Sequence, residues 1–349
     1  MSLPLKTDYP PMEAQSALKI PEGDEWQYEP KWDGFRCLAF RDGSQVEIQS
    51  KSGQSLGRYF PEVVEAILAL EAKKFVLDGE IIVPVGKQLS FDDLLQRIHP
   101  AASRIAKLSK ETPAQLVVFD LLVDEHGSPL VAEPLHVRRK KLDDFAAKFF
   151  QGGIQLSPAT PKFSVAKKWF ETLGGGLDGI IAKKVNLPYQ SGERTGMLKI
   201  KNLRTADCVI GGFRYASKGK VAGSLLLGLY DDQGLLHHVG FTSGLSAAER
   251  PALTKRLEAL IQPPGFTGRA PGGPSRWSTA RSEEWNPLKP ELVVEVQYDH
   301  FTGGRFRHGT KLLRWRPDKK PKQCTMAQVE RDTRSPLGLL ASQLQSEAW

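Results

Sequence analysis

The chain has 349 residues, 40% hydrophobic and 25% charged, with no apolar run long enough to span a membrane and no signal-peptide pattern, so we expect a cytoplasmic protein of two domains. Its three cysteines lie far apart, which argues against a zinc site and a disulfide framework. The formal net charge of +8 favours a polyanionic partner such as nucleic acid, although a solvated basic face would carry the same charge.

The first two hundred residues mix strand and helix patterns. Lys31 ends a strand, and the next two strands flank Asp42-Gly43, a strong hairpin signal. Ser90 is a good N-cap for a short helix. Apolar periodicity predicts helices over 61–70, 91–97 and 138–149, and strands over 35–40, 46–49, 75–83, 115–123, 179–184 and 197–201.

After about Leu203 the chain changes to short strands between Gly-rich and Asp-rich turns. Five such strands with one helix are typical of a small OB-fold barrel. The strands are expected over 206–213, 224–230, 235–241, 292–298 and 312–315, and the helix over 247–261. The last stretch, 335–349, has leucines at helical spacing, and we expect it to pack on the barrel.

The segment Lys31-Trp32-Asp33-Gly34-Phe35-Arg36 places a lysine beside an acid, a glycine and an arginine. A lysine nucleophile needs its free amine near neutral pH, so its pKa must fall, and neighbouring cations would lower it. Lys183, Lys199 and Lys201 lie on short strands and are able to line a triphosphate. Taken singly, each lysine is more commonly a solvated strand residue.

Two acids lie within otherwise apolar strands, Glu80 and Asp178. A carboxylate among such neighbours is costly unless it is paired or holds a metal, and a nucleoside triphosphate arrives with a divalent cation. Each acid also precedes or follows a glycine, so a turn is the alternative. Phe119 is most simply a core aromatic, and its functional alternative is stacking on a purine.

Seven short motifs follow one another along the chain. They contain Lys31 to Arg36, Ser50 to Gly53, Asp78 to Glu80, Phe119-Asp120, Asp178 to Lys183, Lys199 to Lys201, and Arg316 to Lys319. This order resembles that of the covalent nucleotidyltransferases and, among them, the ATP-dependent DNA ligases, and the resemblance covers nearly the whole chain. The motif Gly303-Gly304-Arg305-Phe306-Arg307-His308-Gly309 is similar to that of the compact bacterial repair ligases of the ligase C type.

The resemblance implies an α+β nucleotidyltransferase domain over 1–203, with antiparallel sheets flanked by helices, and an OB-fold domain with a C-terminal extension over 204–349. It implies that Lys31 carries AMP. It further implies ATP contacts from Glu29, Arg36, Lys51, Glu80, Phe119, Lys183, Lys199, Lys201, Arg316, Asp318 and Lys319, metal contacts from Glu80 and Asp178, and DNA contacts from Arg305, Arg307 and Arg314.

Two positions depart from the ligase pattern. Lys51 stands where arginine is usual, so a forked phosphate contact becomes a point charge. Asp178 stands where glutamate is usual, and its shorter side chain would hold a metal through water. The implied cofactors are ATP with Mg²⁺ or Mn²⁺.

The implied activity is nick sealing in bacterial DNA repair through a lysyl-AMP and an adenylated 5′-phosphate. The resemblance also implies a nucleoid-associated monomer that acts on nicked duplex DNA. A primase-polymerase or another repair protein is the implied partner. Three alternatives remain open at this point: an mRNA-capping guanylyltransferase, an RNA ligase, and an inactive nucleic-acid-binding module.

Overall fold

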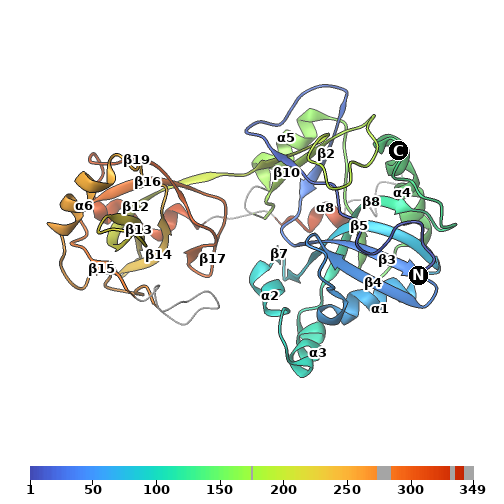
Figure 1. Cartoon of the computed structure of the whole chain (residues 1–349), viewed down its shortest axis with the longest axis horizontal. Coiled ribbons are helices and arrows are strands. Elements are labelled where there is room, and N and C mark those ends of the chain that lie inside the picture. Colours follow the sequence, from blue (N-terminus) through green and yellow to red (C-terminus); the bar gives the residue numbers. More distant parts are fainter. Residues whose placement is uncertain (174–175, 273–283, 331–334, 342–349) are drawn as a thin grey trace. The chain divides into compact units, whose positions relative to one another are not determined.

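The computed structural model describes residues 1–173, 176–272, 284–330 and 335–341, which form two compact units (Figure 1). The first unit comprises Met1–Asn202 and the C-terminal helix α8 (Gly338–Ala341), and the second is Leu203–Asp332. None of the helices in these ranges is long and apolar enough to cross a membrane.

The larger sheet of the first unit has the order β4-β3-β5-β8-β9. The expected hairpin is present as β3 (Phe35–Asp42) and β4 (Gln45–Ser50), and Gly43 supplies the positive φ of 61° that its turn needs. The other strands are β5 (Lys74–Ile82), β8 (Gln115–Val123) and β9 (Ile154–Leu156). Helix α4 (Leu135–Phe149) connects β8 to β9, and this crossover makes the pair parallel instead of antiparallel as expected.

Helices cover this sheet through apolar side chains. Helices α1 (Pro61–Ala69) and α4 bury Ile67, Leu142 and Phe145 in one cluster with Phe75 and Leu77 of β5. Helix α2 (Phe91–Gln96) begins where predicted, because the Ser90 hydroxyl accepts a hydrogen bond from the Asp93 amide at 3.2 Å. Periodicity did not predict α3 (Ala102–Glu111), which buries Ile105 alone, or α5 (Phe163–Thr172), which buries Ala166 alone.

The smaller sheet of the first unit has the order β1-β11-β10-β2. Its strands are β1 (Gln15–Ser16), β11 (Met197–Lys201), β10 (Gly179–Lys184) and β2 (Trp26–Lys31). Strands β10 and β11 match their predicted ranges, and β10 lies antiparallel to both β2 and β11. This sheet therefore brings the lysines of three separate motifs onto neighbouring strands.

The second unit is built on a sheet of order β14-β13-β12-β16-β19, the strand order of an OB-fold. Its edges meet at one bridge, where the Thr242 hydroxyl donates to the Thr310 carbonyl at 2.9 Å, so the barrel is only partly closed. The strands and helix run over β12 (Arg204–Tyr215), β13 (Ala222–Tyr230), β14 (Leu236–Thr242), α6 (Arg250–Glu258), β15 (Asn286–Pro287, paired with β12), β16 (Val293–Tyr298) and β19 (Lys311–Trp315).

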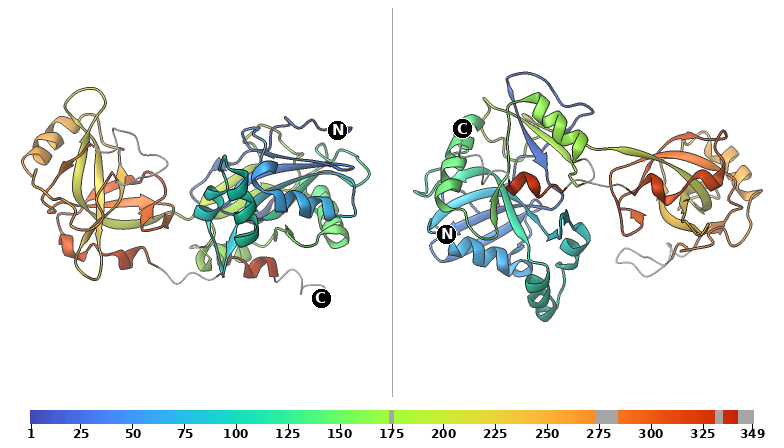
Figure 2. Two further views of the ribbon diagram at one scale, coloured as in Figure 1. Left: turned by 90° about the horizontal axis from the view of Figure 1, so that it is seen from below. Right: turned by 180° about the vertical axis from the view of Figure 1, so that it is seen from behind.

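The C-terminal helix corrects one prediction. Leu340 of α8 is 7% exposed and joins a cluster with Trp32, Ile82, Val117 and Leu177 of the first unit. Figures 1 and 2 show α8 within this unit. The expectation that this stretch packs on the barrel is wrong for α8, and the rest of the stretch, 342–349, lies outside the described residues. Leucines at helical spacing indicate an apolar face, but they do not indicate which of two domains receives it.

Candidate active site

The pairing of β2 with β10 brings Lys31 to a carboxylate. Lys31 lies opposite Gly179, and the Lys31 ammonium forms an ion pair with Asp178, the residue before it. Gly179 has a φ of 143°, and a Cβ at this position would lie 2.0 Å from the Ile200 carbonyl oxygen. Only glycine therefore fits, and the close backbone approach also leaves Lys201 Nζ 3.9 Å from Asp178 Oδ1.

Around Lys31 the first unit forms a pocket of about 170 Å³. Most of the residues predicted for ATP lie here, although they come from six strands of the two sheets and from the loop after β4. Asp178 and Lys201 are absent from the lining and join the group through their ion pairs. The predicted residues that line the pocket are Glu29, Lys31, Arg36, Lys51, Glu80, Phe119, Lys183 and Lys199.

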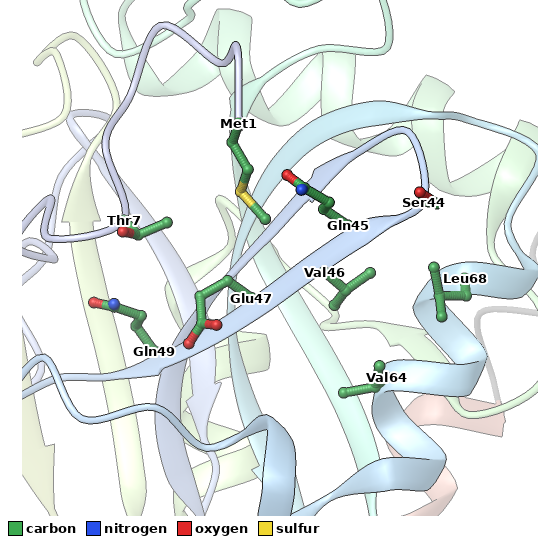
Figure 3. A pocket seen from close by; sticks show the side chains of 9 residues that line it. All are labelled: Met1, Thr7, Ser44, Gln45, Val46, Glu47, Gln49, Val64 and Leu68. Carbon is green, nitrogen blue, oxygen red and sulfur yellow. The ribbon is translucent and has the colours of Figure 1, made fainter.

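A second hollow, at the β3–β4 hairpin, contains none of the predicted residues. Strand β4 lines it with Gln45, Glu47 and Gln49, and α1 lines it with Val64 and Leu68 (Figure 3). Its side chains offer one carboxylate and two amide groups but no lysine nucleophile. The chemistry predicted from the sequence therefore belongs to the pocket around Lys31.

Glu29 is fixed by two side chains of the smaller sheet. Lys183 Nζ lies 2.8 Å from Glu29 Oε2, and Gln27 Nε2 donates to Glu29 Oε1 at 2.9 Å. Glu29 is 2% exposed, so these contacts compensate for the burial of its charge. Gln27 was not predicted. Its position opposite Lys183 in the β2–β10 register explains its role.

Arg36 is held from beneath by a second buried carboxylate. Its Nε and Nη2 donate to the two oxygens of Asp78 at 2.5 and 2.6 Å, and Asp78 is fully buried. The Tyr189 hydroxyl donates to the same carboxylate at 2.6 Å. The Arg36 guanidinium and the Lys183 ammonium lie 4.4 and 4.6 Å from the centre of the Phe119 ring. Sequence reasoning assigned no role to Asp78 or Tyr189.

The electrostatics of Lys31 differ from the prediction. Burial alone would lower the pKa of its ammonium, but the charges of Asp178 and Glu80 outweigh burial, and its pKa is raised. The expectation of a lowered pKa at Lys31 is therefore wrong for this structure. Burial raises the pKa of Glu80 to about 7, although Lys31 and Arg36 oppose the shift. The predicted effect of crowded cations appears at Lys199 instead, where burial first, and then Lys31 and Lys51, lower the pKa.

A third carboxylate at the pocket was also missed. Glu13 lines the pocket and accepts ion pairs from Lys51 at 3.2 Å and from Arg194 at 3.0 Å. These two contacts, led by the hydrogen bond from Lys51, lower the pKa of Glu13. Of the predicted cations, Lys51 therefore already has a carboxylate partner at the pocket.

In the second unit, Arg316, Asp318 and Lys319 form one ionic network with Asp207 of β12. Arg316 Nη1 lies 2.8 Å from Asp207 Oδ1, and Lys319 Nζ lies 2.6 Å from Asp207 Oδ2. Arg316 also contacts Asp318, and this hydrogen bond is the main cause that lowers the pKa of Asp318 to about 2. Asp207 lay outside the predicted site. A charged residue in the apolar run around Val209 was the available signal.

Two of the three arginines predicted for DNA lie on strands of the second unit, and Arg307 directly follows one of these strands. Arg305 begins β18 (Arg305–Phe306), which pairs with β17 (Phe301–Thr302), and the Arg307 amide donates to the His300 carbonyl at 3.0 Å. Arg314 lies on β19, with its Nε 2.6 Å from Glu295 Oε2. The DNA contacts of these residues stay a prediction.

Each unit matches a family model of the ATP-dependent DNA ligases. The family of the ATP dependent DNA ligase domain matches residues 10–201, and that of the ATP dependent DNA ligase C terminal region matches residues 218–319.

Among curated relatives, DNA ligase C1 of Mycolicibacterium smegmatis is 44% identical over 95% of this chain and 96% of its own length. DNA ligase C of Mycobacterium tuberculosis is 42% identical with the same coverage. A solved Lig E DNA ligase structure, 17% identical, has a TM-score of 0.53 over 87% of this chain and 99% of its own and supports the fold. The chain belongs to the ATP-dependent DNA ligases.

Proposed function

We propose that this ligase seals nicks in duplex DNA through AMP carried on Lys31. The observation that supports this most is the position of Lys31, which ends β2 inside a pocket lined by Lys51, Lys183 and Lys199. These cations suit a triphosphate, because they neutralise the charge that develops during phosphoryl transfer. Phe119 offers the pocket an aromatic ring, and Glu29 offers a carboxylate that accepts hydrogen bonds from an adenine amino group.

In the first step, the Lys31 amine attacks the α-phosphorus of ATP, a phosphorus–nitrogen bond forms, and pyrophosphate leaves. The Lys31 ammonium first gives up a proton to solvent, and its ion pair with Asp178 orients it in the pocket. Arg316 and Lys319 of the second unit supply positive charge to the leaving pyrophosphate. Arg36 and Glu80 bind the ribose of the nucleotide.

In the second step, an oxygen of the 5′-phosphate at the nick attacks the AMP phosphorus and Lys31 leaves. In the third step the 3′-hydroxyl attacks the adenylated 5′-phosphate and AMP leaves. Arg305, Arg307 and Arg314 contact DNA phosphates, so binding is independent of sequence and sensitive to salt. DNA repair is the proposed setting, with a primase-polymerase as the proposed partner.

Glu80 and Asp178 would hold the divalent cation that accompanies ATP. Both carboxylates act on the Lys31 ammonium, so they lie where the reaction occurs. Hard oxygen ligands suit Mg²⁺ or Mn²⁺, and these two carboxylates would supply them. The cation would withdraw charge from the phosphates.

The test is incubation of the protein with α-labelled ATP and Mg²⁺, beside labelled GTP and a Lys31→Ala variant. We expect acid-stable label from ATP alone, none in the variant, and discharge of the label by nicked DNA with appearance of the sealed strand. A Lys199→Ala variant should form the label more slowly, because it retains the nucleophile but loses one phosphate contact.

The other outcomes would indicate a different activity or a different nucleophile. Label from GTP would indicate a capping enzyme, and label discharged only by nicked RNA would indicate an RNA ligase. Label that survives in Lys31→Ala would move the nucleophile to another residue. An unlabelled protein, with Mg²⁺ and with Mn²⁺, would contradict the mechanism.

A further inference from the structure

Asp207 occupies the centre of the cation network in the second unit. Its two carboxylate oxygens are divided between two cations, Oδ1 to Arg316 at 2.8 Å and Oδ2 to Lys319 at 2.6 Å. Asp207 itself is 8% exposed, so its charge depends on these partners. A single carboxylate therefore holds both cations that the proposed mechanism assigns to pyrophosphate.

The backbone of Asp207 is fixed separately from its side chain. The Asp207 amide donates to Gln328 Oε1 at 3.0 Å, and Gln328 Nε2 donates to the Asp207 carbonyl at 3.1 Å. The residue also lies opposite Glu295 in the β12–β16 ladder. Loss of the carboxylate charge would therefore leave the strand in place, which separates the charge of Asp207 from its structural position.

Two carboxylates already contact the Arg316 guanidinium. Its Nη1 donates to Asp207 at 2.8 Å, and its Nε and Nη2 donate to Asp318 at 2.9 and 2.8 Å. Each of the three nitrogens therefore has a carboxylate partner, and only the second N–H of Nη1 and of Nη2 remains for another acceptor. A phosphate oxygen that approaches Nη1 meets the negative charge of Asp207, so the two anions compete for the same cation.

We propose that Asp207 competes with the triphosphate and with pyrophosphate for Arg316 and Lys319. The carboxylate takes the place of phosphate oxygens while no nucleotide is bound, and it keeps the two cations together and oriented. When phosphate oxygens replace the Asp207 carboxylate, its contacts with Arg316 and Lys319 break together. This inference rests on the proposed role of Arg316 and Lys319 in lysyl-AMP formation.

The competition affects one step in both directions. In the forward reaction Lys31 attacks the α-phosphorus and pyrophosphate leaves. In the reverse reaction a pyrophosphate oxygen attacks the AMP phosphorus, the phosphorus–nitrogen bond breaks, and the Lys31 amine takes up a proton. Removal of the Asp207 charge should therefore favour the binding of ATP and of pyrophosphate alike, and it should leave the joining of an already adenylated nick unchanged.

The experiment compares the wild-type full chain with Asp207→Asn, which keeps the size of the side chain and the backbone contacts with Gln328. The matched control is Glu258→Gln, which removes one negative charge at an exposed hydrogen bond to the Tyr215 hydroxyl in the same unit. Three quantities are measured: the KM for ATP in lysyl-AMP formation, the pyrophosphate concentration that half-maximally discharges lysyl-AMP, and the rate of sealing of a pre-adenylated nick.

We expect Asp207→Asn to lower the KM for ATP and the half-maximal pyrophosphate concentration by about three- to tenfold, which corresponds to the loss of two partly exposed ion pairs. The rate of sealing of the pre-adenylated nick should stay unchanged. Glu258→Gln should match the wild type throughout. Asp207→Glu, which keeps the charge, should restore values near those of the wild type and would show that a loss of folding does not explain the result.

A higher KM for ATP in Asp207→Asn would overturn the competition and make Asp207 an orienting residue only. Unchanged values in all three assays would also overturn it. Arg316→Ala and Lys319→Ala separate this inference from its basis. If neither slows lysyl-AMP formation, the assigned roles of the two cations fail; if both slow it while Asp207→Asn has no effect, only the competition fails.

Discussion

The pocket of the first unit and the cation network of the second unit pair their charges differently. In the pocket, Lys183 and Arg36 each have a carboxylate of their own, Glu29 and Asp78 respectively. Asp178 pairs with Lys31 and lies 3.9 Å from Lys201 as well. In the second unit one carboxylate holds two cations. Dedicated pairs can open one at a time as a substrate enters, whereas a shared carboxylate releases its cations together.

The two regions also differ in burial, and burial determines what each pair contributes to stability. Asp78 is fully buried beneath Arg36, whereas the side chain of Asp318 beside Arg316 is 63% exposed. A buried charge that loses its partner is costly, and an exposed one is solvated by water. The following substitutions test this contrast.

The largest loss of stability is expected for Asp78→Ala. This variant leaves the Arg36 guanidinium and the Tyr189 hydroxyl without their shared acceptor, and we expect the free energy of unfolding to fall by about 3–5 kcal/mol. Urea denaturation measures the change. Asp318→Asn in the second unit is the control and should leave stability almost unchanged. Equal losses in the two variants would remove the distinction between the regions.

The next effect concerns α8. Leu340 is 7% exposed in the cluster around Trp32, and Leu340→Ala should cost the first unit about 2 kcal/mol. Hydrogen exchange read by mass spectrometry should show faster exchange at peptides that contain Trp32 and Leu177, and no change at β12. Leu18→Ala, at a leucine that is 93% exposed, is the control. Faster exchange at β12 instead would show that α8 packs on the barrel.

Sequence reasoning found the elements and residues whose signals are local. The Asp42-Gly43 turn, the Ser90 cap and the lysines of β10 and β11 were recognised from a few neighbouring residues each. Tyr189 was missed because it contacts Asp78 across 111 positions of sequence, and pairing of this kind leaves no short-range pattern. The raised pKa of Lys31 was missed for the same reason, because Asp178 reaches it only through the β2–β10 register.

A pH-dependent effect is expected in the second unit. Burial, followed by Arg305, Arg214 and Arg269, lowers the pKa of His238 from 6.5 to about 3. The unfolded chain binds a proton at this histidine below about pH 6.5, while the folded unit does not until about pH 3. Stability contributed by the neutral ring is therefore complete above pH 6.5 and falls with decreasing pH by up to about 1.4 kcal/mol per pH unit.

His238→Phe tests this effect, because phenylalanine keeps a ring of similar size beside Phe266 and removes the titration. Hydrogen exchange of β13 and β14 peptides between pH 6.5 and 4, corrected for the intrinsic rate, measures the stability of the unit. The wild type should lose protection steadily over this range and the variant should lose less. Parallel losses would show that another group titrates.

The smallest effect is expected at Glu13, which pairs with two cations at the edge of the pocket. The side chains of Lys51 and Arg194 are 56% and 71% exposed, so Glu13→Gln should change the free energy of unfolding by less than about 1 kcal/mol. The variant gains one net positive charge and frees two cations, and we expect tighter binding of nicked DNA at low salt. Fluorescence anisotropy at low and high salt measures the affinity. A gain that persists at high salt would contradict an electrostatic origin, whereas a loss of affinity would mean that Glu13 orients Lys51 for the DNA phosphate and does not compete with it.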